Sequence, residues 1–243
     1  MTRSSGTRRH GLARVLSKRG ICSRSEAERL IRAGQVRLDG RVVRDPEHPT
    51  DLQAALIDVA GSAQAMSPRY VMLNKPRGLV TTARDEHGRD TVYRCFEGSG
   101  LGWLAPVGRL DKASEGLLLF TNDPQWGAAI TDPAVGPDKT YHVQVDRVPD
   151  ADALQALSDG IDCDGETLSV KSVALLRSGG KTAWLEIVLD EGRNRQIRRL
   201  LAARDIAVLR LVRVAIGSLQ LGQLAKGQWR ELTADEIAAL GGD

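Results

Sequence analysis

Apolar side chains in the first sixty residues follow helical spacing and then strand-like spacing. Within 12–16, three of them stand at i, i+3 and i+4, which predicts a short helix with one buried stripe. Ser23 and Glu26 have the spacing of an S-x-x-E capping box, so a second helix is predicted to begin there. Within 36–43, two short apolar runs flank Asp39-Gly40, a pair that favours a tight hairpin turn. The predicted order is helix, helix, hairpin.

From Tyr70 onward the pattern changes to short strands separated by helices. We predict strands at 70–74, 79–82, 104–107, 117–121, 139–145, 168–176, 182–189 and 208–213. The first two of these are expected to pair as a hairpin. Helices are predicted at 123–130, 150–160 and 194–203. This order predicts an α+β fold in which a small α/β domain, 10–60, is joined by a linker, 61–68, to a larger domain, 69–240, with a mixed, mainly antiparallel sheet.

The composition is that of an ordinary globular protein. The 243 residues are 42% apolar and 27% charged, and no apolar run approaches the ~20 residues needed to cross a bilayer. The basic N-terminus has no apolar signal-peptide core, so we expect no secretion. Three cysteines without CxxC spacing argue against a disulfide framework or a zinc site. These features favour a cytoplasmic protein without a membrane partner.

Charge is distributed unevenly along the chain. Residues 1–69 contain 13 Lys and Arg against 7 Asp and Glu, or +6, whereas the rest contains 21 against 24, or −3. A basic module of this kind favours a nucleic-acid partner, although a basic N-terminal region can also serve solubility alone. Aromatic residues make up only 4% of the chain, which disfavours a base-stacking RNA-binding platform.

One carboxylate stands out as a candidate for chemistry. Asp111 lies in a charged segment bracketed by glycines, Gly108–Gly116, directly before the apolar run 117–120. At the edge of a core, a neighbouring cation would keep this carboxylate ionised, so that it could act as a nucleophile or an electrostatic stabiliser. The alternative is a surface loop with a salt bridge. Dinucleotide, P-loop, HExxH and nucleophile-elbow motifs are absent from the sequence, which argues against dehydrogenases, kinases, zinc proteases and serine hydrolases.

Several ordered segments carry a family resemblance. The run Gly-Arg-Leu-Asp-Lys-Ala-Ser-Glu-Gly-Leu-Leu-Leu-Phe-Thr-Asn-Asp at 108–123 resembles the catalytic motif of the RsuA/RluB/RluE/RluF family of ribosomal RNA pseudouridine synthases. Segments 73–78, 139–141 and 191–200 are similar to further motifs of that family, in the same order. Residues 12–59 resemble its S4-like RNA-binding domain. The resemblance implies an isomerase that converts uridine in RNA to pseudouridine without a metal, a nucleotide or any other cofactor.

The resemblance also assigns roles within the site. Asp111 would be the essential carboxylate, which attacks C1′ or C6 or serves as the base toward a glycal-like intermediate. Tyr141 would pack on the uracil ring, and Leu200 would line the base pocket. A cation should hold Asp111 ionised; Arg198 is the expected partner, with Arg193 as the second choice.

The target uridine would have to be flipped out of its helix, and Arg109 would fill the space it leaves. The other side chains expected to contact RNA are Arg24, Arg29, Arg32, Lys75, Arg193, Arg195 and Arg199.

The expected partner is ribosomal RNA or a pre-ribosomal particle, bound by a monomer. Segments 209–213 and 227–230 resemble the large-subunit branch of the family and favour 23S rRNA over 16S rRNA. A non-catalytic ribosome-assembly factor on the same scaffold is the main alternative function. A glycosidase that pairs Asp111 with Glu115 is a more remote one, and the basic N-terminal module argues against it.

Overall fold

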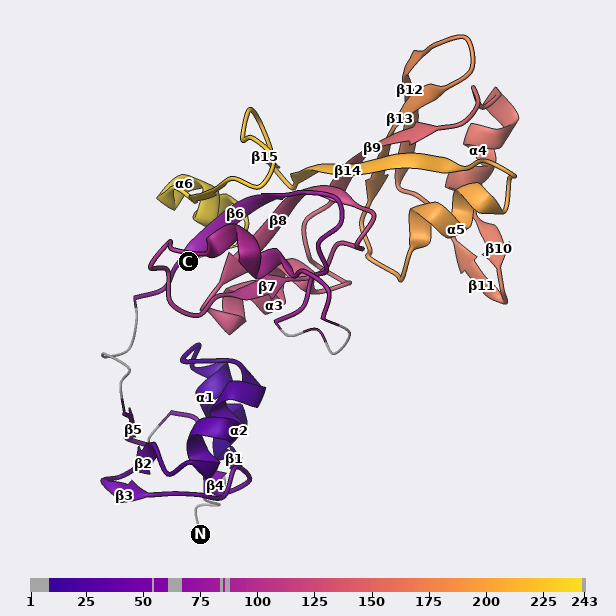
Figure 1. Cartoon of the computed structure of the whole chain (residues 1–243). Helices are drawn as coiled ribbons and strands as arrows, with labels where there is room; N and C mark the ends of the chain where they lie inside the picture. Colours follow the sequence, from indigo (N-terminus) through magenta and orange to yellow (C-terminus); the bar gives the residue numbers. More distant parts are fainter. Residues whose placement is uncertain (1–8, 54, 61–66, 84, 86–87, 242–243) are drawn as a thin grey trace. The chain divides into compact units, whose positions relative to one another are not determined.

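The structure of the chain, a computed structural model, describes residues 9–53, 55–60, 67–83, 85 and 88–241. It divides into two compact units (Figure 1). The first contains the chain up to Arg69 together with Gly100–Ala105 and Thr121–Pro124, and the second contains the remainder. Most of the predicted linker, 61–68, lies outside the described residues. No helix in the described part of the chain has the length and apolar character that crossing a bilayer demands.

The first unit confirms the predicted order of helix, helix and hairpin. Its elements are β1 (His10–Gly11), α1 (Leu12–Lys18), α2 (Arg24–Arg32), β2 (Val36–Leu38), β3 (Arg41–Val42), β4 (Pro49–Thr50) and β5 (Ile57–Val59). The apolar stripe of α1 is fully buried against α2 and the small β3-β2-β5 sheet. Asp39 and Gly40 both have positive φ, 48° and 80°, as the predicted hairpin turn requires.

Only half of the predicted capping box forms at the start of α2. The Ser23 hydroxyl accepts a hydrogen bond from the Glu26 backbone N–H at 3.1 Å. The return bond, from the Ser23 backbone to the Glu26 side chain, is missing because that carboxylate binds the Arg29 guanidinium at 2.6 and 2.9 Å. The helix therefore begins where the sequence predicts, with a single side-chain cap.

The second unit is built on one mixed sheet. Its elements are β6 (Tyr70–Lys75), η1 (Val92–Phe96), β7 (Ala105–Val107), β8 (Glu115–Thr121), α3 (Pro124–Thr131), β9 (Lys139–Val145), α4 (Ala151–Asp159), β10 (Ile161–Cys163), β11 (Glu166–Leu168), β12 (Ser172–Ser178), β13 (Ala183–Leu189), α5 (Gln196–Ala202), β14 (Val208–Ile216), β15 (Leu219–Gln220), β16 (Trp229–Glu231) and α6 (Ala234–Ala239). Among the described residues, nine strands join in the sheet, whose main path is β12-β13-β9-β14-β8-β6-β16.

The long strands β9, β13 and β14 run side by side (Figure 1), and α4 and α5 pack beside them against β12 and β14. Most strand pairs are antiparallel, but β14 and β8 are parallel, with Val212 opposite Glu115 and Arg213 opposite Gly116. β8 is buried along its whole length, as its continuous apolar sequence predicts. The fold is the predicted α+β arrangement with a mainly antiparallel sheet.

Two of the strand predictions are wrong, and one hairpin is not among the predictions. The predicted strand 168–176 is interrupted, because β11 ends at Leu168 and β12 begins at Ser172. The predicted hairpin of 70–74 with 79–82 is wrong: β6 pairs with β16, and Val80 makes only an isolated bridge to Thr91. A Pro follows the strand at position 76 and the next turn binds the Asp111 loop, so the chain does not fold straight back. The hairpin β10–β11 is not among the predicted elements, although its turn, Asp164-Gly165, has the positive φ values and the sequence of a tight turn.

Gly116 is the glycine whose backbone the sheet most depends on. Its φ is +102°, and a Cβ there would lie 2.8 Å from the Arg213 backbone nitrogen and closer still to the Arg213 carbonyl oxygen. Gly116→Ala is therefore expected to push β8 away from β14 and to cost about 3 kcal/mol or more in the free energy of unfolding. Chemical denaturation measures this loss. Gly165→Ala is the control, because Gly165 also has positive φ but has open space around it.

Gly165→Ala should lower the free energy of unfolding by about 1 to 2 kcal/mol, which is the cost of holding alanine in a left-handed backbone conformation. Equal losses in the two variants would show that close approach of β8 and β14 contributes nothing.

Candidate active site

The loop between β7 and β8 presents Asp111 and is held from below by the end of β6. The Lys75 ammonium donates hydrogen bonds to three backbone carbonyls, at 2.8 Å to Ser114, 3.2 Å to Asp111 and 3.1 Å to Pro76. The Thr81 hydroxyl donates to the Leu110 carbonyl at 2.8 Å. Within the loop, the Ser114 N–H donates to the Asp111 carbonyl. These hydrogen bonds all end on backbone carbonyls, so they fix the course of the loop. None of them involves the Asp111 carboxylate.

Lys75, which the sequence led us to expect at an RNA contact, is buried in this structure and exposes no surface to a ligand. Its side chain is fully buried beneath the loop, with all three ammonium donors occupied. Burial lowers the pKa of Lys75 to about 8, against the opposing effect of the nearby carboxylates of Asp111 and Glu115. The residue is a structural cation that positions the Asp111 loop.

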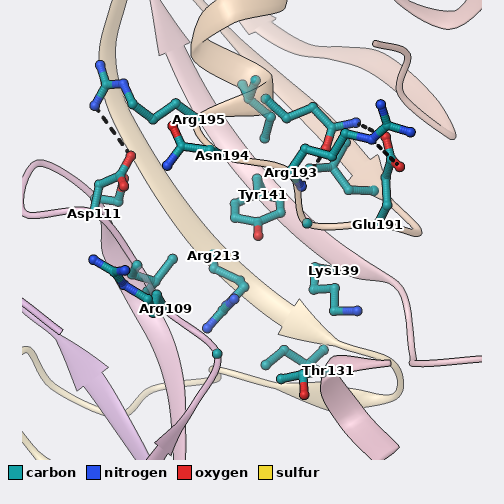
Figure 2. A pocket seen from close by; sticks show the side chains of 18 of the residues that line it. Arg109, Asp111, Thr131, Lys139, Tyr141, Glu191, Arg193, Asn194, Arg195 and Arg213 are labelled. Atoms are coloured by element: carbon teal, nitrogen blue, oxygen red, sulfur yellow. Dashed lines mark hydrogen bonds and ion pairs between the residues drawn. The ribbon is translucent and has the colours of Figure 1, made fainter. Parts of the chain in front are cut away.

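Asp111 opens into a large pocket on one face of the sheet. The cavity has a volume of about 680 Å³ and is walled by the Asp111 loop, the end of α3, strands β9 and β14, and the loop from β13 into α5. Figure 2 shows Tyr141 and Arg213 in its middle, with Lys139 and Thr131 on the side away from Asp111. A nucleoside fits within a space of this size.

The cation that faces Asp111 is Arg195 rather than Arg198. The Arg195 Nη1 lies 3.5 Å from the Asp111 Oδ2, and the two side chains are 52% and 36% exposed (Figure 2). Arg195 is the N-cap of α5 and has a left-handed backbone with φ 52°. This conformation is uncommon for a non-glycine residue, and here it directs the side chain toward the carboxylate. The expected pairing of Asp111 with Arg198 is therefore wrong.

Arg198 nevertheless lines the same pocket. It donates to the Ala113 carbonyl at 3.4 Å, and its Nε is buried without a hydrogen-bond partner among the described residues. Burial lowers the pKa of Arg198, the neighbouring Arg195 lowers it further, and Asp111 opposes both. Two guanidinium groups thus lie near one carboxylate, which leaves the site with positive charge to offer a polyanion.

Two further arginines of this region bind intramolecular carboxylates. Arg193, the second choice for pairing with Asp111, binds Glu166 and Glu191 instead, each at 2.8 Å. Arg199 binds Glu166 at 2.6 Å and the Cys163 carbonyl at 2.6 Å. The hydrogen bonds to these glutamates raise the pKa values of Arg193 and Arg199. Arg193 and Arg199 share Glu166 on β11, so an RNA phosphate would compete with that carboxylate for them.

Gln196 organises the turn that carries these arginines, a role that no sequence motif indicates. This residue is 2% exposed. Its side-chain amide donates to the Ser169 carbonyl at 2.8 Å and to Glu191 at 2.7 Å, and its carbonyl accepts the Arg193 N–H at 3.2 Å. Two of these partners, Glu191 and Arg193, lie in the loop that leads into α5, and Arg195 follows them. Gln196 therefore fixes the backbone from which the Arg195 side chain reaches Asp111.

Apolar residues of the pocket are partly those expected. Tyr141 is 8% exposed and lines the cavity from β9, as predicted for a residue that packs on a base. Leu200 is fully buried in the core and is absent from the pocket wall, so its predicted place in the base pocket is wrong. On a helix that begins at 196, Ile197 faces the cavity instead, together with Leu211 from β14.

Glu115 is not a second catalytic carboxylate. It is 2% exposed and lies outside the pocket wall, where it binds the Arg210 guanidinium at 3.0 and 3.1 Å and also binds Lys226. Burial would raise the pKa of Glu115, but these two cations outweigh it and hold the pKa below its usual value. The glycosidase hypothesis, which needs Asp111 and Glu115 at one site, is therefore wrong.

Arg109 and the arginines of α2 have different surroundings. Arg109 is exposed on the rim of the pocket beside Asp111 (Figure 2). Arg24, Arg29 and Arg32 each lie near a glutamate of their own unit, yet their side chains remain more than half exposed, at 58%, 62% and 64%. Exposed ion pairs of this kind are weak, so these arginines remain available to a stronger anion.

No group of three or more His, Cys, Asp or Glu side chains is arranged to hold a metal ion within the residues that the structure describes. The described groups that contact Asp111 are Arg195, the Lys75 ammonium and backbone groups of its own loop. The chemistry that this site offers is that of a carboxylate beside cations, an aromatic ring and a half-enclosed cavity.

Known proteins match both parts of the chain. Residues 69–203 match the family described as RNA pseudouridylate synthase, and residues 11–51 match the S4 domain. The chain is 35% identical over 225 residues to an uncharacterised RNA pseudouridine synthase of Rickettsia conorii, covering 92% of this chain and 96% of the relative. It is 38% identical over 234 residues to one of Mycobacterium bovis, covering 94% and 92%.

A solved structure agrees with these matches. A crystal structure of a pseudouridylate synthase superimposes with a TM-score of 0.67 and 30% identity, covering 95% of this chain and 99% of that one. Fold and pocket together define an RNA-modifying isomerase with an S4 domain. The chain belongs to the RNA pseudouridine synthase family.

Proposed function

We propose that this pseudouridine synthase acts on ribosomal RNA, with Asp111 as the catalytic carboxylate and a uridine of 23S rRNA as the target. The observation that carries the assignment of Asp111 is its position: a carboxylate at the mouth of a 680 Å³ pocket, 3.5 Å from Arg195 and on a loop held by backbone bonds. We place the RNA-docking domain at 10–60, a linker at 61–68 and the catalytic domain at 69–240, in a monomer that works in the cytoplasm.

The reaction breaks the N1–C1′ bond of uridine, turns the uracil and joins its C5 to C1′. C5 loses its proton and N1 takes one up, so substrate and product are isomers. Asp111 serves this exchange as nucleophile toward C1′ or C6, or as the base toward a glycal-like intermediate. Arg195 and Arg198 place positive charge beside the carboxylate, and this charge stabilises the anionic uracil while it turns. Tyr141 packs on the uracil ring and limits where the base can move.

A uridine stacked in a helix cannot reach Asp111, so the target must be everted at a cost of a few kcal/mol. Arg109, exposed on the rim, fills the space that the base leaves. Contacts with phosphates by Arg24, Arg29 and Arg32 on the S4 domain add affinity without sequence choice. The substrate is mature rRNA or a precursor particle.

Pseudouridine mapping tests the choice of substrate. Ribosomal RNA from cells with and without the gene is treated with carbodiimide and read by reverse transcription, so that each pseudouridine stops the polymerase. We expect one stop in 23S rRNA to vanish without the gene and to return with the wild-type copy. Loss of a stop in 16S rRNA alone would overturn the large-subunit target, and an unchanged pattern in both would overturn rRNA as the substrate.

A further inference from the structure

Two cations on neighbouring strands line the same pocket, one in its middle and one on the side away from Asp111 (Figure 2). Lys139 lies two residues before Tyr141 on β9, so their side chains share one face of the sheet. Arg213 on β14 is the cross-strand neighbour of Tyr141. All three line the cavity. Figure 2 shows Arg213 beside Tyr141 in the middle of the pocket, and Lys139 on the side away from Asp111 with Thr131 next to it.

Arg213 is buried with part of its hydrogen-bonding capacity unused. Arg213 is 5% exposed, and its Nε donates a hydrogen bond to the Leu117 carbonyl at 2.7 Å. Its Nη2 is buried and has no hydrogen-bond partner in the part of the chain that the structure describes. An unpaired buried guanidinium nitrogen is costly, so a ligand group that accepts from it is favoured at this position.

Lys139 adds a second charge without a carboxylate bound to it. Burial lowers the pKa of Lys139, and the positive charge of Arg213 lowers it further, while Asp138 and Asp190 act in the opposite direction. No ion pair of Lys139 is found among the described residues. Asp138 binds Lys171 at 2.8 and 3.0 Å, and Asp132 on the rim accepts the Ala134 N–H at 2.7 Å.

We propose that Lys139 and Arg213 form a subsite for a backbone phosphate of the RNA strand, adjacent to the nucleoside held between Asp111 and Tyr141. This subsite rests on the proposed function only in that Asp111 marks where the ribose lies. A phosphate suits it better than a uracil carbonyl, because a buried cation and a partly buried one favour a full negative charge, which a carbonyl lacks. The 680 Å³ cavity is large enough to extend beyond one nucleoside to the phosphate.

Salt dependence of RNA binding tests the subsite directly. The full chain and its Lys139→Gln variant are titrated with 16S and 23S rRNA transcripts between about 50 and 200 mM salt. If Lys139 binds a phosphate, its replacement is expected to weaken RNA binding and to lower the slope of log K against log salt by about 0.7 to 0.9. Lys181→Gln is the matched control, because Lys181 is exposed in the β12–β13 turn and lies outside the pocket wall.

Mononucleotides then identify the phosphate. Binding of uridine, uridine 3′-monophosphate and uridine 5′-monophosphate is followed by NMR of the labelled full chain. We expect one monophosphate to bind about tenfold more tightly than uridine, and Lys139→Gln to remove that gain while uridine affinity stays unchanged. Lys139→Arg should retain it. Arg213→Gln is a second variant, and its folding is checked by circular dichroism, because Arg213 also binds the Leu117 carbonyl.

Two results would overturn the subsite. One is an unchanged salt slope for Lys139→Gln; the other is equal binding of uridine and both monophosphates to the wild-type chain. A fall in uridine affinity equal to the fall in monophosphate affinity would assign these cations to the base. Because every readout is binding, failure of Asp111 as the catalytic group, or of rRNA as the natural substrate, would appear in turnover and mapping instead.

Discussion

Asp111→Asn is expected to abolish pseudouridine formation, lowering the rate on the order of 10⁴-fold or more, while folding and RNA affinity stay close to wild type. An amide has the size of the carboxylate but can serve neither as nucleophile nor as base. Folding should survive because the contacts that hold the loop end on the backbone of Asp111, whereas its side chain makes one long ion pair at 3.5 Å. Release of tritium from C5-labelled uridine in rRNA measures turnover, and filter binding measures affinity.

Asp152→Asn is the matched control for this prediction. Asp152 lies in the first turn of α4 and is exposed, outside the pocket wall, so the same change of charge there should leave turnover near wild type. If Asp111→Asn kept turnover within about tenfold of wild type, Asp111 could not be the catalytic carboxylate. If the variant lost RNA affinity together with activity, its role would be substrate binding.

The spacing of apolar residues predicted many of the helices and strands, because each element must bury one face and expose the other. β9 alternates in the sequence and in burial, since one face turns to the core and the other to solvent. α4 begins after Asp150, which caps it through the Ala153 N–H. The partner of β6 could not be predicted in this way. It is β16, about 155 residues further along the chain, and the apolar pattern of a strand does not specify which strand lies beside it.

The site was predictable in its residue types but not in its pairings. The glycine-bracketed segment indicates Asp111, yet the identity of its cation depends on where α5 begins. The sequence predicts a start at 194; the helix starts at 196, and Arg195 adopts a left-handed conformation before it. Because Arg195 lies before the helix, helical spacing does not set the direction of its side chain, and Arg195 forms the ion pair with Asp111.

Lys75 shows a second limit of sequence reasoning. It ends β6 directly before a proline, where a lysine is usually exposed. Its burial becomes visible only when the Asp111 loop, about 36 residues later, folds over it and supplies the carbonyls of Asp111 and Ser114. Lys139 and Arg213 are similar: each lies on an ordinary strand, and only the register of β9 with β14 brings them together.

Lys75→Met is expected to lower the free energy of unfolding by about 3 kcal/mol or more, because it leaves the carbonyls under the loop without their donor. Urea denaturation measures the loss. Turnover of the folded fraction should also fall, since the Asp111 loop is no longer fixed from below. Lys112→Met is the control, because Lys112 is exposed in the same loop and should change stability by no more than about 0.5 kcal/mol.

The difference in unfolding free energy between wild type and Lys75→Met should depend on pH. This dependence distinguishes a buried lysine from one on the surface. Burial places the pKa of Lys75 at about 8 in the folded chain, below its ordinary 10.5, so between these values the unfolded chain binds more protons than the folded one. Stability contributed by Lys75 therefore rises with pH through this window, by up to about 1.4 kcal/mol per unit, and the burial penalty is complete below pH 8. The gap between wild type and Lys75→Met should widen from pH 7.5 to pH 9.5. A constant gap would mean that Lys75 lies in water in the folded chain, and a gap that narrows would mean that the nearby carboxylates raise the pKa of Lys75 more than burial lowers it.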